Sequence, residues 1–221
     1  MMHIPFVNIH THKAVGEGIE LVNIDDFDAV FGSAFASVGL HPWQVGKCNH
    51  MDAIDKIEQM CQSGQLAAIG EIGLDRAIET DIGLQMSIFE MQLSMAKHYH
   101  LPIIIHCVRA YSDFLQILKN EVSTTFIFHG FNGGNSTANL LLSHGAMISF
   151  GANLLKSDKL QNVFRNIPND CIFLETDMDA VKISDIYSFA AKLRGVSLDE
   201  IKLIVFNNLK RIFGDRWRTT G

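Results

Sequence analysis

Six side chains that commonly bind metal ions occur at widely spaced positions, each near the end of a short apolar run. They are His10 and His12, Glu71, His106, His129 and Asp177. Neutral imidazole binds borderline divalent ions, whereas a carboxylate lowers the net charge of a site and can bridge two ions. A single histidine in a strand is more often a packed residue. Six such residues, each near the end of an apolar run, favour a metal site. Burying an ionisable side chain costs free energy unless it has a partner, and a metal ion can be that partner.

The elements that position these side chains are predicted from apolar runs bounded by Gly, Pro or polar residues. Such runs predict eight strands, over residues 4–10, 18–24, 35–41, 67–74, 102–107, 124–130, 146–151 and 171–177. Most are separated by segments of helical period, such as Leu84, Ile88, Met91 and Met95. A capping box at Ser197 and Glu200 indicates the start of the last helix. This alternation predicts an α/β chain folded as a TIM (β/α)8 barrel.

In such a barrel the carboxyl ends of the strands meet at one mouth, and every candidate ligand falls at one of these ends. Side chains alternate between the faces of a strand, so His10 and His12 share one face. The same alternation groups Glu71 with Gly73 and Asp75. We expect Gly73 to leave open space beside Glu71 for an ion or a substrate.

At 221 residues the chain is short for this barrel, which is typically about 250 residues long. No linker or repeat divides it, so we expect one domain over residues 1–221, with a frayed tail at 214–221. Only residues 13–17 separate the first two predicted strands. Since these are too few for a helix, the outer ring is expected to lack one helix.

A net charge of −6 provides no general attraction for nucleic acid and argues against tight, extended DNA binding. It does not exclude a phosphodiester substrate, because a bound divalent ion would supply local positive charge. The start of the chain has neither a basic segment nor a long apolar one, and no apolar run is long enough for a membrane span. We therefore expect a cytoplasmic protein, without a membrane association or an obligate protein partner.

Several short motifs occur in a fixed order over nearly the whole chain. They are HTH at 10–12, GLHPW at 39–43, AIGEIGLD at 68–75, PIIIHC at 102–107, FHGFNGG at 128–134 and LETD at 174–177. With them the chain resembles the TatD family of metal-dependent hydrolases. The resemblance implies a barrel of the amidohydrolase superfamily. It also implies a divalent-metal-dependent deoxyribonuclease or exonuclease that hydrolyses phosphodiester bonds by metal-activated water attack.

The resemblance also implies a ligand set. One ion would be bound by His10, His12, Glu71 and Asp177, and a second by Glu71, His106 and His129. Glu71 would bridge the two, and Asp177 would orient or deprotonate the attacking water, so both are expected to be catalytic. The cofactor would be one or two divalent ions per chain, Mg, Mn or Zn, and the partner a transiently bound DNA or another phosphodiester.

Two departures from the family concern the substrate. The arginine after the strand-five histidine is shifted by one residue to Arg109, and the segment MDAVKIS replaces a longer loop after Asp177. Five residues are expected to contact substrate or to hold a ligand in place, namely His41, Asp75, Arg109, Asn132 and Glu175. Glu175 would hydrogen-bond a ligand histidine.

Two other functions stay open. The short loops and acidic charge would also suit a metal-dependent amidohydrolase or lactonase that acts on a small molecule. The third alternative is a barrel that keeps its metal for stability and serves as a binding module.

Overall fold

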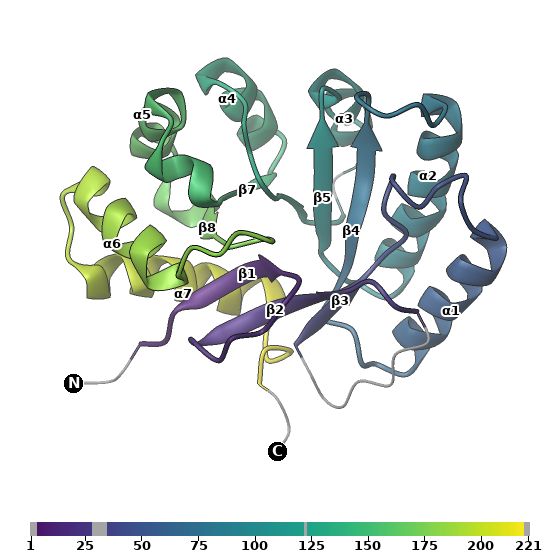
Figure 1. Cartoon of the computed structure of the whole chain (residues 1–221), viewed down its shortest axis with the longest axis horizontal. Coiled ribbons are helices and arrows are strands. Elements are labelled where there is room, and N and C mark those ends of the chain that lie inside the picture. Colours follow the sequence, from purple (N-terminus) through teal and green to yellow (C-terminus); the bar gives the residue numbers. More distant parts are fainter. Residues whose placement is uncertain (1–3, 28–34, 122, 219–221) are drawn as a thin grey trace.

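The computed structural model describes residues 4–27, 35–121 and 123–218, and its strands form one sheet in chain order from β1 to β8. The strands are β1 Val7–Thr11, β2 Ile19–Ile24, β3 Ala36–Val38, β4 Ala68–Asp75, β5 Ile103–Val108, β6 Phe126–Phe128, β7 Met147–Phe150 and β8 Ile172–Leu174. Every neighbouring pair is parallel. The predicted (β/α)8 barrel is therefore confirmed (Figure 1).

Helices flank most of the sheet on its outer face (Figure 1). They are α1 His50–Gln62, α2 Ile82–His98, α3 Tyr111–Leu118, α4 Asn135–Ser143, α5 Asp158–Asn166, α6 Ile183–Arg194 and α7 Leu198–Phe213, with short 3-10 helices η1 Ala152–Leu155 and η2 Asn169–Cys171. The predicted capping box at Ser197 and Glu200 starts α7. Residues 12–18, between β1 and β2, contain no helix, as expected from their number. No helix in the described part of the chain is long and apolar enough to cross a membrane.

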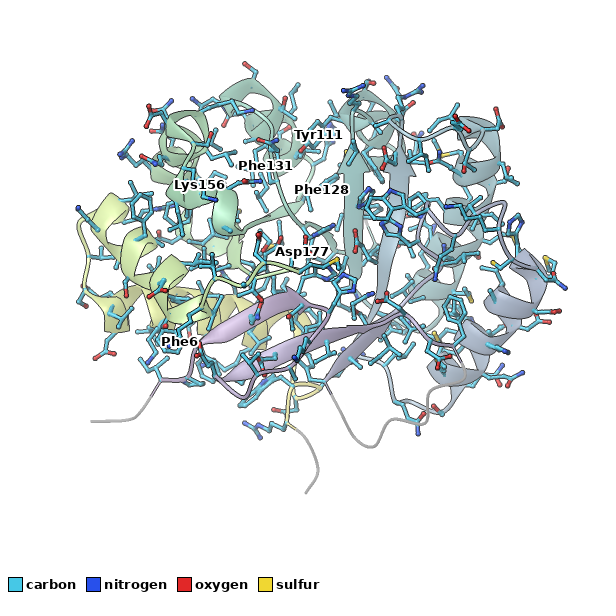
Figure 2. All side chains as sticks on the ribbon, in the orientation of Figure 1. Phe6, Tyr111, Phe128, Phe131, Lys156 and Asp177 are labelled. Carbon is cyan, nitrogen blue, oxygen red and sulfur yellow. The ribbon has the colours of Figure 1, made fainter. Side chains whose placement is uncertain are left out.

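Most strands are buried on both faces, which explains their nearly continuous apolar sequences, whereas β2 is only partly buried. All five residues of β1 and all eight of β4 are buried. Aromatic rings fill the layer between the sheet and the helices. Phe114 of α3, for example, packs edge-on against Phe128 of β6, with ring centroids 5.3 Å apart. Tyr111, Phe128 and Phe131 gather on one side of the barrel (Figure 2). This packing fixes the strand ends from which the candidate ligands project.

The barrel closes between β1 and the segment that follows β8. Asn8 donates from its side-chain amide to the Thr176 hydroxyl at 2.8 Å, and the Thr176 backbone N–H donates to the Asn8 side-chain oxygen at 3.0 Å. The Asp177 N–H donates to the His10 carbonyl at 3.0 Å, and Thr11 forms a parallel bridge with Asp177. Because β8 itself ends at Leu174, this closure is what brings Asp177 beside β1.

Part of the segment that is expected to fray is described by the structure. Residues 214–218 form turns. The Trp217 ring packs on Phe206 of α7, with centroids 5.3 Å apart. Residues 219–221 lie outside the described part of the chain.

The expectation of open space at Gly73 is wrong. A Cβ atom at this position would lie 1.9 Å from the carbonyl oxygen of His106, its pairing partner on β5. The backbone φ of +157° is also one that residues with side chains rarely adopt. Glycine is therefore needed because β4 and β5 approach closely, and the approach brings His106 toward Glu71.

Gly73→Ala is expected to lower the free energy of unfolding by about 3 kcal/mol or more, because two backbones would have to move apart in a packed core. The matched control is Gly134→Ala, where an added Cβ meets no atom within 4 Å and φ is −97°. This control should cost about 1 kcal/mol or less. Urea denaturation of both variants measures the difference. Equal midpoints would show that the β4–β5 approach places no demand on residue 73.

Candidate metal centre

Five imidazole rings converge on the carboxylate of Glu71 at the carboxyl mouth of the barrel. Glu71 lies on β4 and is only 4% exposed. Its Oε1 lies 2.6 Å from His106 Nδ1, 2.6 Å from His129 Nε2 and 3.2 Å from His41 Nε2. Its Oε2 faces His10 Nε2 at 3.3 Å and His12 Nε2 at 3.7 Å. All six predicted ligands thus lie together, with Asp177 completing the group beside His10 and His12.

Two histidine nitrogens lie close to both carboxylates that are proposed as their fellow ligands. Nε2 of His10 lies 3.3 Å from Glu71 Oε2 and 3.5 Å from Asp177 Oδ1, and Nε2 of His12 lies 3.7 and 3.6 Å from the same oxygens. Tetrahedral ligands with bonds of about 2.0 to 2.2 Å lie roughly 3.3 to 3.6 Å apart. His10 is fully buried and neither ring nitrogen has a hydrogen-bond partner. An ion on Nε2 would satisfy one of these buried polar atoms, so the residues fit a metal.

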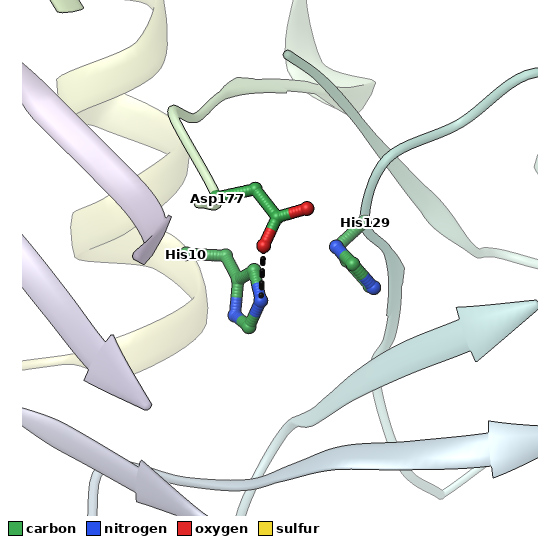
Figure 3. A group of neighbouring side chains, drawn as sticks. All are labelled: His10, His129 and Asp177. Atoms are coloured by element: carbon green, nitrogen blue, oxygen red, sulfur yellow. Dashed lines mark ion pairs between the residues drawn. The ribbon is translucent and has the colours of Figure 1, made fainter. Parts of the chain in front are cut away.

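In Figure 3, a carboxylate oxygen of Asp177 points down toward His10, and the His129 ring lies to the right of both. The His10 and His129 ring centroids are 4.4 Å apart. His10, His129 and Asp177 form one candidate metal-binding group, and His10, His12 and Glu71 form another. His129 is therefore close to both the Asp177 side and the Glu71 side of the site.

His41, which is expected to contact substrate or to hold a ligand in place, lies beside Glu71 and His106. It follows β3, and its Nε2 lies within a third candidate group with Glu71 and His106. The His41 and His106 rings meet edge to face at 4.4 Å. His41 can thus donate to the same ion as His106.

The two carboxylates among the proposed ligands, Glu71 and Asp177, both have lowered pKa values. Burial opposes ionisation of Glu71, but His129, His10, His106 and His12 keep its pKa well below the ordinary value. Burial also opposes ionisation of Asp177, whose pKa is lowered by His10 and His129.

The pKa values of three imidazoles, those of His10, His12 and His129, are raised, whereas burial lowers the pKa of His41. The hydrogen bond to Glu71, and then the partner Asp25, raise the pKa of His12 to about 9. His129 has a pKa well above its ordinary value despite burial, because Glu71 and Glu175 face it. Without an ion, protons on the histidines balance the carboxylates. A divalent ion would replace those protons, so its affinity should depend on pH.

A carboxylate lies beyond three of the imidazoles, on the side away from Glu71. Asp25 lies 2.9 Å from His12 Nδ1, Asp75 3.3 Å from His106 Nε2, and Glu175 3.5 Å from His129 Nδ1. Such carboxylates fix the tautomer and orientation of a metal-binding histidine. Glu175 is fully buried and also accepts from the Gly130 N–H at 2.5 Å. Asp75 and Glu175, both candidates from the sequence, thus face His106 and His129.

Two of the expected substrate residues lie away from this group. A cavity of about 280 Å³ opens on the site and is lined by His12, Asp25, His41, Trp43, Gln44, Glu71, His106, His129, Asp177 and Met178. Neither Arg109 nor Asn132 belongs to this lining, and both side chains are exposed. The Asn132 carbonyl instead accepts from Lys159 at 2.6 Å. Arg109 and Asn132 are close in sequence to ligand histidines, but neither lines this cavity.

Asp25 and Trp43 belong to the site but are not predicted from the sequence. Asp25 directly follows the second strand, so the reasoning applied to the other strand ends would have found it. Trp43 offers no comparable signal, since a tryptophan in a loop is not a metal ligand. Only the fold shows that its indole N–H donates to Asp75 at 2.8 Å.

Comparisons with known proteins agree with this geometry. A model of the family "TatD related DNase" matches residues 20–214. The metal-dependent hydrolase YabD of Bacillus subtilis, described as uncharacterized, is 28% identical over 215 residues, covering 86% of this chain and 80% of YabD. A protein of Schizosaccharomyces pombe named deoxyribonuclease Tat-D is 31% identical over 157 residues, covering 64% of this chain and 50% of its own length.

Among solved structures, the TatD homologue YjjV of Escherichia coli superposes with a TM-score of 0.82 at 23% identity, covering 94% of this chain and 97% of YjjV. A TatD family hydrolase of Entamoeba histolytica gives a TM-score of 0.80 at 20% identity, covering 97% of this chain and 99% of that protein. These two similarities show the fold. The family match spans most of the chain, so the protein belongs to the TatD family of metal-dependent hydrolases.

Proposed function

We propose that this protein hydrolyses phosphodiester bonds, with DNA or a related phosphodiester as its transient substrate. The observation that carries the proposal is the approach of two histidine nitrogens to two carboxylates at 3.3 to 3.7 Å, beside an open cavity at the barrel mouth. The family description and the name of the yeast relative, both of which specify a deoxyribonuclease, support the choice of bond.

The proposed ligand set has two overlapping halves. His10, His12, Glu71 and Asp177 would hold one ion. Glu71 would hold a second together with His106 and His129, and His41 is placed to join this half. The number of imidazoles favours Zn or Mn, whereas Mg prefers oxygen ligands. One or two ions per chain, of Mg, Mn or Zn, are therefore the cofactors to test.

Divalent ions bound here would polarise the phosphoryl oxygens and lower the pKa of an attacking water. The protein's own residues must hold and orient the reactants. Asp177 suits this role because its side chain is 37% exposed, whereas that of His10 is fully buried. Its lowered pKa keeps it ionised, so it can accept a hydrogen bond from water and then the proton. Glu71 holds the two halves of the ligand set together.

Substrate size is limited by the charge and shape of the mouth. The chain has a net charge of −6, and the site itself is rich in carboxylates. Phosphate contacts would therefore depend mainly on the bound ions instead of a basic groove. A single strand or a strand end that enters the cavity fits this arrangement better than a long duplex.

Asp177→Asn and Glu71→Gln should each lower turnover of a labelled single-stranded oligonucleotide by roughly 100- to 10,000-fold, because a proton acceptor or a ligand is lost. Chelator-stripped protein is assayed after separate additions of Mg, Mn and Zn. Asp52→Asn, on the exposed face of α1, is the matched control and should retain activity. Cleavage that survives in Asp177→Asn, or is absent with every metal, would contradict the proposal.

Metal addition should stabilise the stripped protein. At a metal concentration of 100 times the dissociation constant, binding to the folded state adds about 2.7 kcal/mol. For a chain of 221 residues this corresponds to a rise in Tm of roughly 5 to 10 °C. His10→Gln should lose this rise, whereas the control His144→Gln, at a partly exposed residue that follows α4, should keep it. An equal rise in both variants would place the metal elsewhere.

Asp25→Asn should weaken metal affinity about 10- to 100-fold, because His12 would lose the carboxylate that orients it. Isothermal titration of stripped protein with Mn or Zn measures the change. Asp52→Asn is again the control. If the metal affinity is unchanged, the contact between Asp25 and His12 does not contribute to metal binding.

The cavity volume of about 280 Å³ and the short segment after Asp177 favour a second candidate, a lactonase or amidohydrolase acting on a small molecule. Turnover of a lactone or amide panel, without any oligonucleotide cleavage, would select it. Metal-restored turnover of either substrate class would eliminate a binding module without catalysis.

A further inference from the structure

Trp43 is an exposed aromatic residue fixed in one orientation beside the metal centre. It follows β3, and 53% of its surface is exposed. Its indole N–H donates to the buried Asp75 at 2.8 Å, and Asp75 in turn faces His106. The indole also meets the His41 ring edge to face at 5.0 Å and the His106 ring at 6.0 Å. A large apolar surface is thus held rigid next to two proposed ligands while it stays open to solvent.

The indole is shared by two neighbouring hollows. One is the cavity of about 280 Å³ over the metal centre. The other is a hollow of about 650 Å³, lined by Trp43, Val45, Gly46, Lys47, Ile78, Glu79, Thr80, Asp81 and Leu84. A substrate group that contacts the indole would therefore lie next to the bond that is cleaved at the metal centre.

The charges of the second hollow indicate what kind of group would fit. One cation, Lys47, is opposed by two carboxylates, Glu79 and Asp81. The two carboxylates would repel a phosphate group, so we do not expect the sugar-phosphate backbone of a nucleic acid to bind in this hollow. Leu84, Val45 and the indole favour a flat, neutral and partly apolar group. A nucleobase has these properties and stacks on aromatic side chains whatever its sequence.

We propose that Trp43 binds the nucleobase adjacent to the scissile phosphodiester by stacking, and so positions that bond at the metal centre. This inference rests on the proposed phosphodiesterase function. Trp43 is then a substrate-binding residue that gives the enzyme a preference for nucleotides over phosphodiesters without a base.

A purely structural role would have a different consequence. If Trp43 acted only by orienting Asp75, and through it His106, its replacement would affect every substrate equally. Two variants separate the roles. Trp43→Phe and Trp43→Leu both lose the N–H donor to Asp75, but only Trp43→Phe keeps a ring that can stack.

The test compares metal-loaded wild type and both variants on two substrates, a short single-stranded oligothymidylate and an oligomer of the same length made entirely of abasic nucleotides. We expect Trp43→Leu to raise KM for the oligothymidylate by roughly 5- to 150-fold, with Trp43→Phe close to wild type. On the abasic oligomer the variants should match each other. Equal losses in Trp43→Leu and Trp43→Phe, or equal losses on both substrates, would overturn the proposal.

A binding measurement tests stacking on Trp43 independently of phosphodiester cleavage. Trp43 and Trp217 are the two tryptophans of the chain, and Trp217 has no hydrogen bond from its indole nitrogen. In a Trp217→Phe protein the fluorescence reports on Trp43 alone. Quenching by oligothymidylate but not by the abasic oligomer supports stacking, even if no phosphodiester is cleaved and the proposed function fails. No difference between the two oligomers would reject stacking, even if cleavage is observed.

Discussion

The burial of one carboxylate among five imidazole rings is the constraint on which the rest of the site depends. Glu71 is 4% exposed, and a desolvated carboxylate is costly unless it is paired. The five rings reach it from four separate places in the chain, at the ends of β1, β3, β5 and β6. Only a fold that brings several strand ends to one mouth can provide such a set. The barrel is therefore a requirement of the site as well as its scaffold.

Two backbone features make this convergence possible. Gly73 lets β4 and β5 approach closely enough for His106 to reach Glu71. The hydrogen bonds between Asn8 and Thr176 close the barrel and bring Asp177 beside His10. A second layer of carboxylates then orients the rings from outside. The site thus contains about as many acidic groups as imidazoles, an arrangement whose charge a divalent ion balances.

The sequence predicted the barrel because parallel strands covered on both faces leave near-continuous apolar runs, and because ligand types recur at their ends. The same reasoning reached Glu175, since a buried carboxylate needs a partner. Strand patterns do not predict the positions of side chains in the loops that follow the strands. Arg109 and Asn132 follow ligand histidines closely, yet neither lines the cavity. Gly73 was misread because alternation gives the face of a residue, not the distance to the neighbouring strand.

The most direct test of the account is a crystal structure of the protein soaked in Mn, with the metal located by its anomalous scattering. The account predicts a peak about 2.0 to 2.3 Å from Nε2 of His10 and of His12 and from carboxylate oxygens of Glu71 and Asp177. Occupancy at His106 and His129 would define the second ion. Full Mn occupancy elsewhere, with no peak at these four donors, would contradict the metal centre and the mechanism built on it.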